Sequence, residues 1–364
     1  MFAVGLMSGT SLDGIDAALI ETDGEGHAEP VAFRCEPYSD QARGTLRAAA
    51  ELALTFEKPR PNPEIVAAAE MITRRHIMVV HQLLAQAGVP LAQVAVVGFH
   101  GQTIAHRPDR RWTWQIGDGA AMANALGRPV VDDFRSADVV AGGQGAPLLP
   151  VYHRAVTAGL DLPVAVLNLG GVGNITYIGA DGTLIAFDTG PANALVDDWM
   201  AAETGAAYDV GGMLAAIGQI DEGVLGAMLD HPYFDLPPPK SLDRADFTIQ
   251  PARGLSPANG ATTLTAFTAA AVALGLRHLP GAPKRLIVAG GGRHNATLMA
   301  MLGDSTGLAA EPIEALGLDG DATEAEGFAY MAVRTLKGLP ISFPGTTGAP
   351  QPMTGGRLHR PASR

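Results

Sequence analysis

The chain opens with two apolar runs separated by a polar bend. Residues 2–7 and 15–21 are rich in apolar side chains, and this pattern predicts two strands joined as a hairpin. Residues 64–87 carry apolar side chains at helical spacing, and Gly88 and Pro90 follow. Glycine and proline at that place are a typical helix stop, so we expect a helix over 64–87.

Two further strands are expected before the middle of the chain. Residues 94–99 form a β-branched run typical of a buried strand, and residues 129–131 predict another. The glycine-rich and polar segment DDFRSADVVAGGQGAPLLP (132–150) changes the composition, and we interpret it as a domain junction.

The second half repeats this layout. Residues 164–169 are apolar, GGVGN forms a glycine turn, and 175–178 resemble a returning strand. The segment VAVVGFHGQT (94–103) has a counterpart in RLIVAGGGRHN (285–295), each after a helical segment. We therefore predict two duplicated α/β domains, although strand-plus-glycine turns also occur in α/β proteins without duplication.

Composition narrows the class of protein. The 364 residues include 25 Lys and Arg against 37 Asp and Glu, a net charge of -12, and aromatic residues are few. Nucleic-acid binding usually needs a basic field, so we expect no nucleic-acid partner. The single Cys35 excludes an intrachain disulfide, and we expect no signal peptide and no membrane span. Together these features predict a cytoplasmic protein.

The bend MSGTSLDGIDAAL (7–19) could hold phosphate. Its glycines allow close approach of the backbone, and its N–H and hydroxyl groups could surround phosphate oxygens. Asp13 and Asp16 are acceptor-only, so they fit beside phosphate only if Mg²⁺ lies between. The alternative is a hairpin whose Ser, Thr and Asp side chains cap their own backbone. The loop alone does not decide between the two.

The stretch FDTGPAN (187–193) places Asp188 at the carboxyl end of a predicted strand, where ligands gather in open α/β sheets. A helix is expected over 192–200, and its N-terminus could receive an anion. Asp188 could instead only cap that helix. The glycines of LIVAGGGRHN (286–295) leave room for a flat group such as a purine, or serve as an ordinary turn.

Polar residues follow three strands between these motifs: His100, Gln102, Gln115, Asp118, Arg135 and Asp138. An arginine, carboxylates, amides and an imidazole together suit a polyhydroxylated ligand that carries a carboxylate. Two common nucleotide-binding motifs are absent from the sequence: the P-loop GxxxxGK[ST], and a GxGxxG that follows a strand, as in Rossmann dinucleotide sites. GDSTG (303–307) matches G-x-S-x-G, but residues 296–302 are expected to be helical, so a serine hydrolase acting through Ser305 is not supported.

Taken in order, GLMSGTSLDGIDAAL, GFHGQT, WQIGDGAAMA, DDFRSADVVAGGQGAPL, NLGGVGNIT, FDTGPAN, GGGRHN and TEAEGFAYMA closely resemble the anhydro-N-acetylmuramic acid kinases. That family belongs to the superfamily of sugar kinases, actin and heat-shock ATPases. The resemblance implies an α/β fold of two ribonuclease-H-like domains around a nucleotide cleft. It implies that ATP and water convert 1,6-anhydro-N-acetylmuramic acid into N-acetylmuramic acid 6-phosphate and ADP, in bacterial cell-wall recycling. It also allows a homodimer.

The resemblance also implies roles for residues. Asp188 would be the catalytic base, and the six polar strand-end residues would line the sugar side. The ATP-binding set would be Gly9, Thr10, Ser11, Leu12, Asp13, Gly14, Ile15, Asp16, Gly170, Gly171, Asn174, Gly290, Gly291, Gly292 and Asn295. Superfamily relatives often carry an aspartate where this chain has Met7, so Asp13 and Asp16 are both candidates for holding Mg²⁺.

The expected domains are 1–135, with the phosphate loop and part of the sugar site, and 136–344, with the second glycine turn, Asp188 and the adenosine region. The tail, 345–364, is rich in proline and glycine and is expected either to pack back on the first domain or to be disordered. Two alternatives stay open. One is another sugar kinase of the superfamily, and the other is a non-catalytic, actin-like nucleotide-binding protein.

Overall fold

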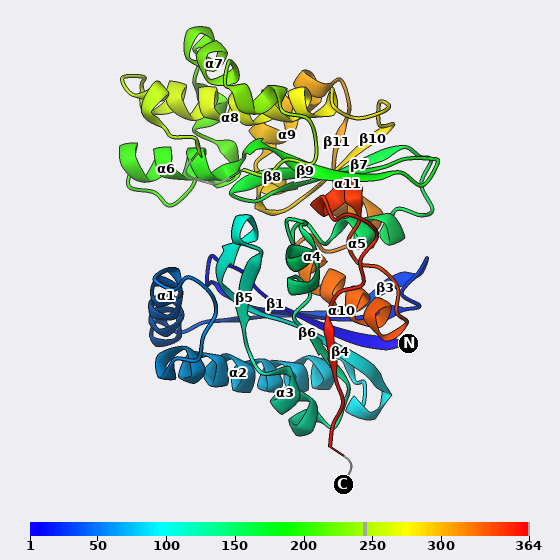
Figure 1. Ribbon diagram of the computed structural model, residues 1–364. Coiled ribbons are helices and arrows are strands. Elements are labelled where there is room, and N and C mark those ends of the chain that lie inside the picture. The colour runs from blue at the N-terminus through cyan, green and yellow to red at the C-terminus, as the bar shows by residue number, and fades with distance from the viewer. Residues whose placement is uncertain (243–245, 363–364) are drawn as a thin grey trace. The chain divides into compact units, whose positions relative to one another are not determined.

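The chain folds into two compact units, each built around one sheet (Figure 1). A computed structural model describes residues 1–242 and 246–362. Unit 1 comprises Met1–Ala158 and Ala322–Arg364, and unit 2 comprises Gly159–Asp321.

The sheet of unit 1 has the strand order β12-β6-β4-β1-β2-β3, with β5 paired to β4 outside this path. Its strands are β1 (Phe2–Ser8), β2 (Gly14–Thr22), β3 (Ala28–Pro37), β4 (Val94–Arg107), β5 (Trp112–Ile116), β6 (Val130–Asp132) and β12 (Arg357–His359). β1 pairs antiparallel with β2 and parallel with β4, which confirms the predicted opening hairpin. β4 continues well beyond the predicted run at 94–99, because residues 102–107 pair with β5.

Helices cover both faces of this sheet (Figure 1). They are α1 (Asp40–Leu54), α2 (Pro63–Ala87), α3 (Gly119–Leu126), α4 (Ser136–Ala141), α5 (Pro150–Val156), α10 (Thr323–Leu336) and α11 (Pro344–Thr347). The predicted helix over 64–87 is confirmed as α2. The Asn62 side chain accepts hydrogen bonds from two amides of the first turn, and Gly88 ends the helix in the left-handed conformation with φ 66°.

The sheet of unit 2 repeats the order of unit 1, as β11-β10-β7-β8-β9. Its strands are β7 (Val164–Leu169), β8 (Val172–Ile178), β9 (Leu184–Pro191), β10 (Arg285–Ala289) and β11 (Ala310–Pro312). The first three strands are antiparallel, and β10 and β11 run parallel to β7. When β5 and β12 are left out, the remaining five strands of unit 1, numbered along the chain, have the order 3-2-1-4-5, and the five strands of unit 2 have the same order. This is the ribonuclease-H-like arrangement, and it confirms the predicted duplication.

The helices of unit 2 are α6 (Asn193–Glu203), α7 (Glu222–Leu229), α8 (Pro257–Leu276) and α9 (Ala296–Thr306). α8 and α9 pack on the sheet through an apolar cluster that includes Leu167, Val272, Val288 and Leu302. Ser305 lies in the last turn of α9. The absence of a nucleophile elbow at GDSTG is thereby confirmed, because an elbow needs a turn between a strand and a helix.

Helix α10 approaches the sheet of unit 1 unusually closely. A Cβ atom at Gly5 of β1 would overlap the carbonyl oxygen of Ala325, and one at Gly98 of β4 would overlap that of Phe328. Only glycine allows this approach, which buries the aromatic ring of Phe328. This packing places α10 in unit 1, although it follows the strands of unit 2 in sequence.

The bounds of the units differ from the expected domains. The first stretch of unit 1 ends at residue 158, whereas the junction was placed after residue 135. The segment 132–150, interpreted as the domain junction, lies within unit 1 and contains α4 and the start of α5. The tail reaches the sheet of unit 1, where β12 pairs antiparallel with β6.

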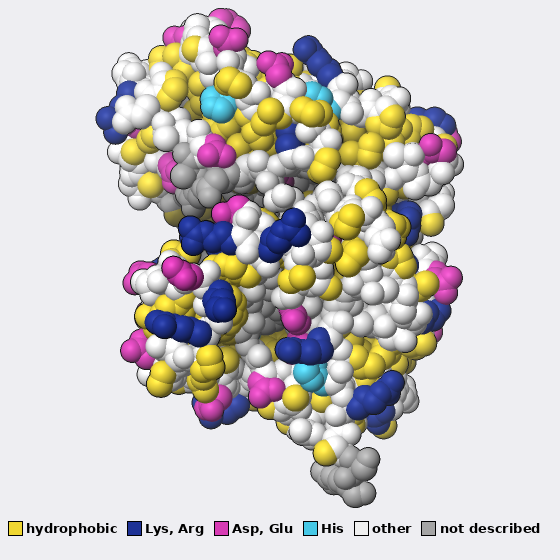
Figure 2. Space-filling model, viewed as in Figure 1, with side chains coloured by type: hydrophobic (Ala, Val, Ile, Leu, Met, Phe, Trp, Pro, Cys, Tyr) yellow, Lys and Arg dark blue, Asp and Glu magenta, His cyan; other side chains and the backbone are white. Residues whose placement is uncertain are grey.

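One apolar helix and the distribution of surface charge concern the environment of the protein. Helix α8 is long and apolar enough to cross a membrane, but 72% of its apolar window is buried within the structure, as is typical of a core helix. On the face drawn in Figure 2, Lys and Arg side chains lie interspersed with Asp and Glu side chains.

Candidate functional site

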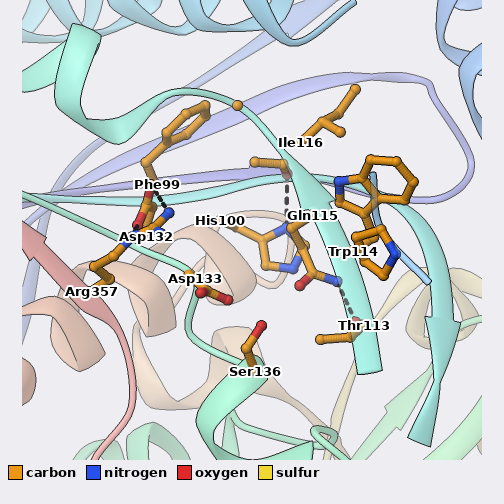
Figure 3. Close-up of a pocket in the computed structure, with 13 residues that line it drawn as sticks. Phe99, His100, Thr113, Trp114, Gln115, Ile116, Asp132, Asp133, Ser136 and Arg357 are labelled. Carbon is orange, nitrogen blue, oxygen red and sulfur yellow. Dashed lines mark hydrogen bonds and ion pairs between the residues drawn. The ribbon is translucent and has the colours of Figure 1, made fainter. Parts of the chain in front are cut away.

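Unit 1 contains a polar pocket of about 300 Å³. It lies where β4, β5, β6 and β12 meet, and Figure 3 shows the side chains around His100 at its centre. It is lined by Pro59, Phe99, His100, Gly101, Thr113, Trp114, Gln115, Ile116, Gly117, Asp132, Asp133, Ser136 and Arg357. The structure thus brings His100 and Gln115 of the predicted sugar-side residues to one pocket.

His100 and Arg135 form a fixed pair. Nε of Arg135 donates a hydrogen bond to Nε2 of His100 at 3.1 Å, and Nδ1 of His100 lies 2.9 Å from the carbonyl oxygen of Gly101. Burial, and then the charge of Arg135, hold the pKa of His100 well below its usual value. The imidazole is therefore neutral, with its proton on Nδ1, and it orients the guanidinium of Arg135.

Glu324 interacts electrostatically with both Arg135 and Asp16. Desolvation raises the pKa of Glu324, the charge of Arg135 lowers it, and the charge of Asp16 raises it. Glu324 lies at the start of α10, inside the stretch TEAEGFAYMA, whose acids are not among the predicted site residues. A glutamate in the first turn of a helix is ordinary in sequence, so nothing local distinguishes Glu324 from a surface residue.

Four of the predicted sugar-side residues are outside the lining of the pocket: Arg135, described above, and three others that make structural contacts. The carboxylate of Asp118 caps α3 by accepting from the amide of Ala121 at 2.8 Å. The carboxylate of Asp138 is buried and accepts from the hydroxyls of Ser342 and Thr347 and from the amide of Gly145.

Gln102, the third of these residues, supports the phosphate-loop candidate. Its Oε1 accepts from the Ser8 hydroxyl at 2.5 Å, and its Nε2 donates to the carbonyl oxygen of Gly9 at 3.1 Å. Its side chain is buried. Gln102 therefore fixes the start of the loop between β1 and β2.

The loop between β1 and β2 is a tight turn with exposed polar groups. Leu12 has φ 60°, and its amide donates to the carbonyl oxygen of Gly9 at 3.2 Å. Thr10, Ser11 and Asp13 are exposed, and within residues 1–242 and 246–362 no hydrogen bond of their side chains is found. The structure therefore does not support the self-capped alternative, because those side chains do not bond to their own backbone.

Asp188 in unit 2 has the environment of a general base. It lies on β9 opposite Asn174 of β8, and its Oδ2 accepts from the amide of Leu242 at 2.9 Å. Burial raises its pKa to about 6, although the hydrogen bond from Leu242 opposes this. A carboxylate with a pKa near neutrality is suited to proton abstraction. Helix α6 begins after Ala192 without a side-chain cap, so Asp188 does not cap it.

The second glycine turn is tied to the start of α6. The carbonyl oxygen of Gly170 accepts from the amide of Asn193 at 3.0 Å, and that of Gly171 accepts from the amides of Ala192 and Ala194. These bonds use amides at the start of α6 that could otherwise receive an anion. The predicted turn of Gly170, Gly171 and Asn174 is thus fixed against α6 and β9.

A larger pocket, of about 620 Å³, lies beside the third glycine segment. It is lined by Asn193, Val196, Asp197, Tyr208, Asp209, Val210, Gly211, Gly291, His294 and Asn295. Its volume lies in the range of small-molecule sites, and its aromatic, aliphatic and amide groups suit a purine nucleoside. Gly291 and Asn295 of the predicted adenosine region line it.

The other two glycines of that segment serve close packing. Gly290 has φ 76°, and a Cβ atom there would lie 2.5 Å from Oδ1 of Asn168. At Gly292 a Cβ atom would lie 2.6 Å from that of Leu169. Asn295 also caps α9 by accepting from the amide of Leu298 at 2.9 Å.

Two ribonuclease-H-like units, one with a polar pocket and one with a nucleoside-sized pocket, define the class of actin-like ATPases and sugar kinases. The sequence profile described as anhydro-N-acetylmuramic acid kinase matches residues 1–360. The chain belongs to this family of kinases, and the resemblance stated from its motifs is confirmed.

The chain is also similar to individual relatives and to solved structures. It is 72% identical to the anhydro-N-acetylmuramic acid kinase of Rhizorhabdus wittichii, over 99% of both chains. It is 56% identical to that of Zymomonas mobilis, over 99% of this chain and 100% of the relative. Component A of the (R)-2-hydroxyglutaryl-CoA dehydratase of Acidaminococcus fermentans is similar in structure at 12% identity, with a TM-score of 0.48 over 92% of this chain and 99% of that one.

Proposed function

We propose that the protein uses ATP and water to convert 1,6-anhydro-N-acetylmuramic acid into N-acetylmuramic acid 6-phosphate and ADP. The reaction would recycle cell-wall sugar, in the cytoplasm, where ATP is available. The observation that carries the proposal is Asp188, a carboxylate whose pKa is raised to about 6 at a strand of the nucleotide-binding fold. Membership of the kinase family supports the identity of the substrates.

In this proposal Asp188 activates water. The water oxygen attacks the anomeric carbon, its proton passes to Asp188, and the bond from that carbon to the 6-oxygen breaks. The departing 6-oxygen attacks the γ-phosphorus of ATP, and ADP leaves. The phosphate thus takes the place of the general acid that an inverting glycosidase would use.

The sugar would bind in the pocket of unit 1. Arg135, oriented by His100 and bonded to the carbonyl oxygen of Gly145 at 2.7 Å, supplies a positive charge beside His100. Such a charge stabilises the negative charge that develops on the 6-oxygen as the bridge opens. Gln115 lies on the pocket wall, where its amide nitrogen donates to the hydroxyls of Thr103 and Thr113 at 3.1 and 2.8 Å.

The phosphates of ATP would be bound by the loop 9–16, whose Thr10 and Ser11 are exposed. Residues 170–174 and 290–295 complete the proposed ATP-binding set, and the pocket beside Gly291 would receive adenosine. Phosphoryl transfer of this kind depends on positioning and charge neutralisation more than on covalent chemistry.

Carboxylate oxygens near the loop fit Mg²⁺. Asp16 is partly buried, and its charge adds to the desolvation that raises the pKa of Glu324, whereas Asp13 is exposed. Among the described residues, no group of three or more His, Cys, Asp or Glu side chains could hold a metal ion. Mg²⁺ bound to ATP needs only one or two protein carboxylates besides phosphates and water. We propose that Asp16 holds it, and Mg²⁺ would neutralise phosphate charge there.

The alternative within this class is a sugar kinase that phosphorylates an ordinary hydroxyl. The test compares ADP release with 1,6-anhydro-N-acetylmuramic acid and with N-acetylmuramic acid. Strict dependence on the anhydro bridge supports the proposal. Equal rates with both sugars would show the ordinary kinase, and ATP binding without turnover on either would show a non-catalytic nucleotide-binding protein.

A further inference from the structure

The C-terminal strand contributes a charged group to the pocket of unit 1. β12 pairs antiparallel with β6, and Arg357 lies directly opposite Asp132 in this register. Both residues line the pocket, and Figure 3 shows the Arg357 guanidinium beside the Asp132 carboxylate. The backbone pairing therefore fixes Arg357 at the wall of a pocket built otherwise from residues more than 200 positions earlier in the chain.

Asp132 holds one edge of the guanidinium. Nε of Arg357 donates to Oδ1 of Asp132 at 3.2 Å, and Nη2 donates to Oδ2 at 3.4 Å. The Asp132 side chain is only 9% exposed, and it also accepts from the amide of Gly119 and contacts Nε2 of His359 at 2.9 Å. A buried carboxylate thus anchors the arginine and limits its rotamers.

The other edge of the guanidinium is open. The Arg357 side chain is 64% exposed, and no hydrogen bond from its Nη1 is found within the described part of the chain. The guanidinium carries five N–H donors in a planar fork that matches a carboxylate in a bidentate pair. One such pair is made with Asp132, and the Nη1 edge is available for a second.

Arg357 is the one Lys or Arg among the 13 residues that line the pocket. The hydrogen bonds and charge of Asp132 raise the pKa of Arg357, and the charges of Asp133 and Asp118 act in the same direction. The protein carries a net charge of -12, so an anionic substrate needs a local cation. The substrate of the proposed function carries one charged group, the carboxylate of its lactyl ether.

We propose that Arg357 binds the lactyl carboxylate and thereby selects muramic acid derivatives over uncharged anhydro sugars. The inference rests on the proposed function and assigns a specificity-determining role to the C-terminal strand. Asp133, the other carboxylate of the pocket wall, is an acceptor and cannot bind this group while ionised.

The test compares two substrates, the anhydro sugar acid and its neutral lactyl amide, which has the same size. In the unchanged protein we expect the KM of the acid to be about tenfold to a hundredfold lower than that of the amide, the range of hydrogen bonds to a charged group. In Arg357→Gln the KM of the acid should rise to that of the amide. The KM of the amide and the kcat of both should stay within about twofold. Arg360→Gln, three residues away and exposed, is the matched control and should keep the preference.

Three results would overturn the inference: no preference for the acid in the unchanged protein, a preference that persists in Arg357→Gln, or an equal loss for acid and amide. The last result would show that Arg357 only supports the fold through Asp132. If Arg357→Gln does not fold, Arg357→Lys is tested instead, because lysine keeps the positive charge but lacks the planar pair of N–H donors. An undiminished preference for the acid in Arg357→Lys would refute bidentate binding. Failure of the unchanged protein to turn over either sugar would refute the proposed function itself.

Discussion

The amide of Leu242 donates a hydrogen bond to Oδ2 of Asp188 at 2.9 Å, and burial nevertheless raises the pKa of Asp188 to about 6. The hydrogen bond alone would lower the pKa, so desolvation is the larger effect. An ionised carboxylate in this place is a stronger base than an exposed aspartate. The first two predictions follow from this balance.

The first prediction concerns the pH dependence of turnover. Asp188 must be ionised to accept a proton, so kcat/KM should fall below about pH 6, tenfold for each pH unit. An aspartate with an ordinary pKa would maintain activity to about pH 4. Initial rates measured from pH 4.5 to 8 with saturating ATP check this, and a kcat/KM that stays constant down to pH 4.5 would contradict the assignment.

The second prediction separates activity from stability in Asp188→Asn. Loss of the base should lower kcat by about 10² to 10⁴, the usual contribution of general base catalysis. The pKa of Asp188 is raised on folding, so the folded state loses stability as pH rises from about 4 through about 6. The asparagine removes this penalty, and it should raise the free energy of unfolding at pH 7.5 by roughly 1–3 kcal/mol.

Urea unfolding at pH 7.5 and at pH 4 measures this effect. The gain should shrink to a small part of its value at pH 4, where the aspartate is protonated in the folded state and only partly ionised in the unfolded state. Asp181→Asn, on the exposed turn before β9, is the control and should keep full activity. Near-normal turnover of Asp188→Asn would show that another group is the base.

The third prediction concerns His100. Its imidazole is neutral and accepts from Arg135, so its role is to position the guanidinium. His100→Gln retains an acceptor near Nε2 and should lose about tenfold in kcat, whereas His100→Ala should lose about a hundredfold. Both variants should keep the acidic limb near pH 6. A limb that disappears in either variant would instead show that His100 transfers a proton.

The fourth prediction tests the packing of α10. A Cβ atom at Gly98 would overlap the carbonyl oxygen of Phe328, so Gly98→Ala should destabilise the protein by at least about 3 kcal/mol. Gly44, inside α1, has no atom within 4 Å of a Cβ position. Gly44→Ala is therefore the matched control and should stabilise by about 0.5–1 kcal/mol. Thermal unfolding of both variants measures the difference, and equal effects would contradict this packing.

Local sequence patterns predict the helices and strands whose formation depends mainly on residues close together in sequence. The hairpin of β1 and β2 follows from two apolar runs around a glycine bend, and α2 follows from apolar spacing with Gly88 as its stop. The motifs also locate His100 and Gln115 at the pocket and Gly291 and Asn295 at the nucleoside-sized pocket.

Contacts between distant segments explain what the sequence does not predict. The place of α10 depends on Gly5 and Gly98, which are separated from Phe328 by hundreds of residues. Asp138 resembles a ligand residue in sequence, but Ser342 and Thr347, distant in the chain, occupy its carboxylate. The short strand β12 has no pattern of its own, because only pairing with β6 makes Arg357–His359 a strand.

The central claim, that opening of the anhydro bridge by water is coupled to phosphoryl transfer, can be tested by one product analysis. The protein is incubated with ATP, Mg²⁺ and 1,6-anhydro-N-acetylmuramic acid in ¹⁸O-labelled water, and the product is analysed by mass spectrometry with fragmentation. The account predicts one ¹⁸O on the anomeric carbon and an unlabelled phosphate on the 6-oxygen. Label in the phosphate, with the anhydro bridge intact, would contradict it and show simple hydrolysis of ATP.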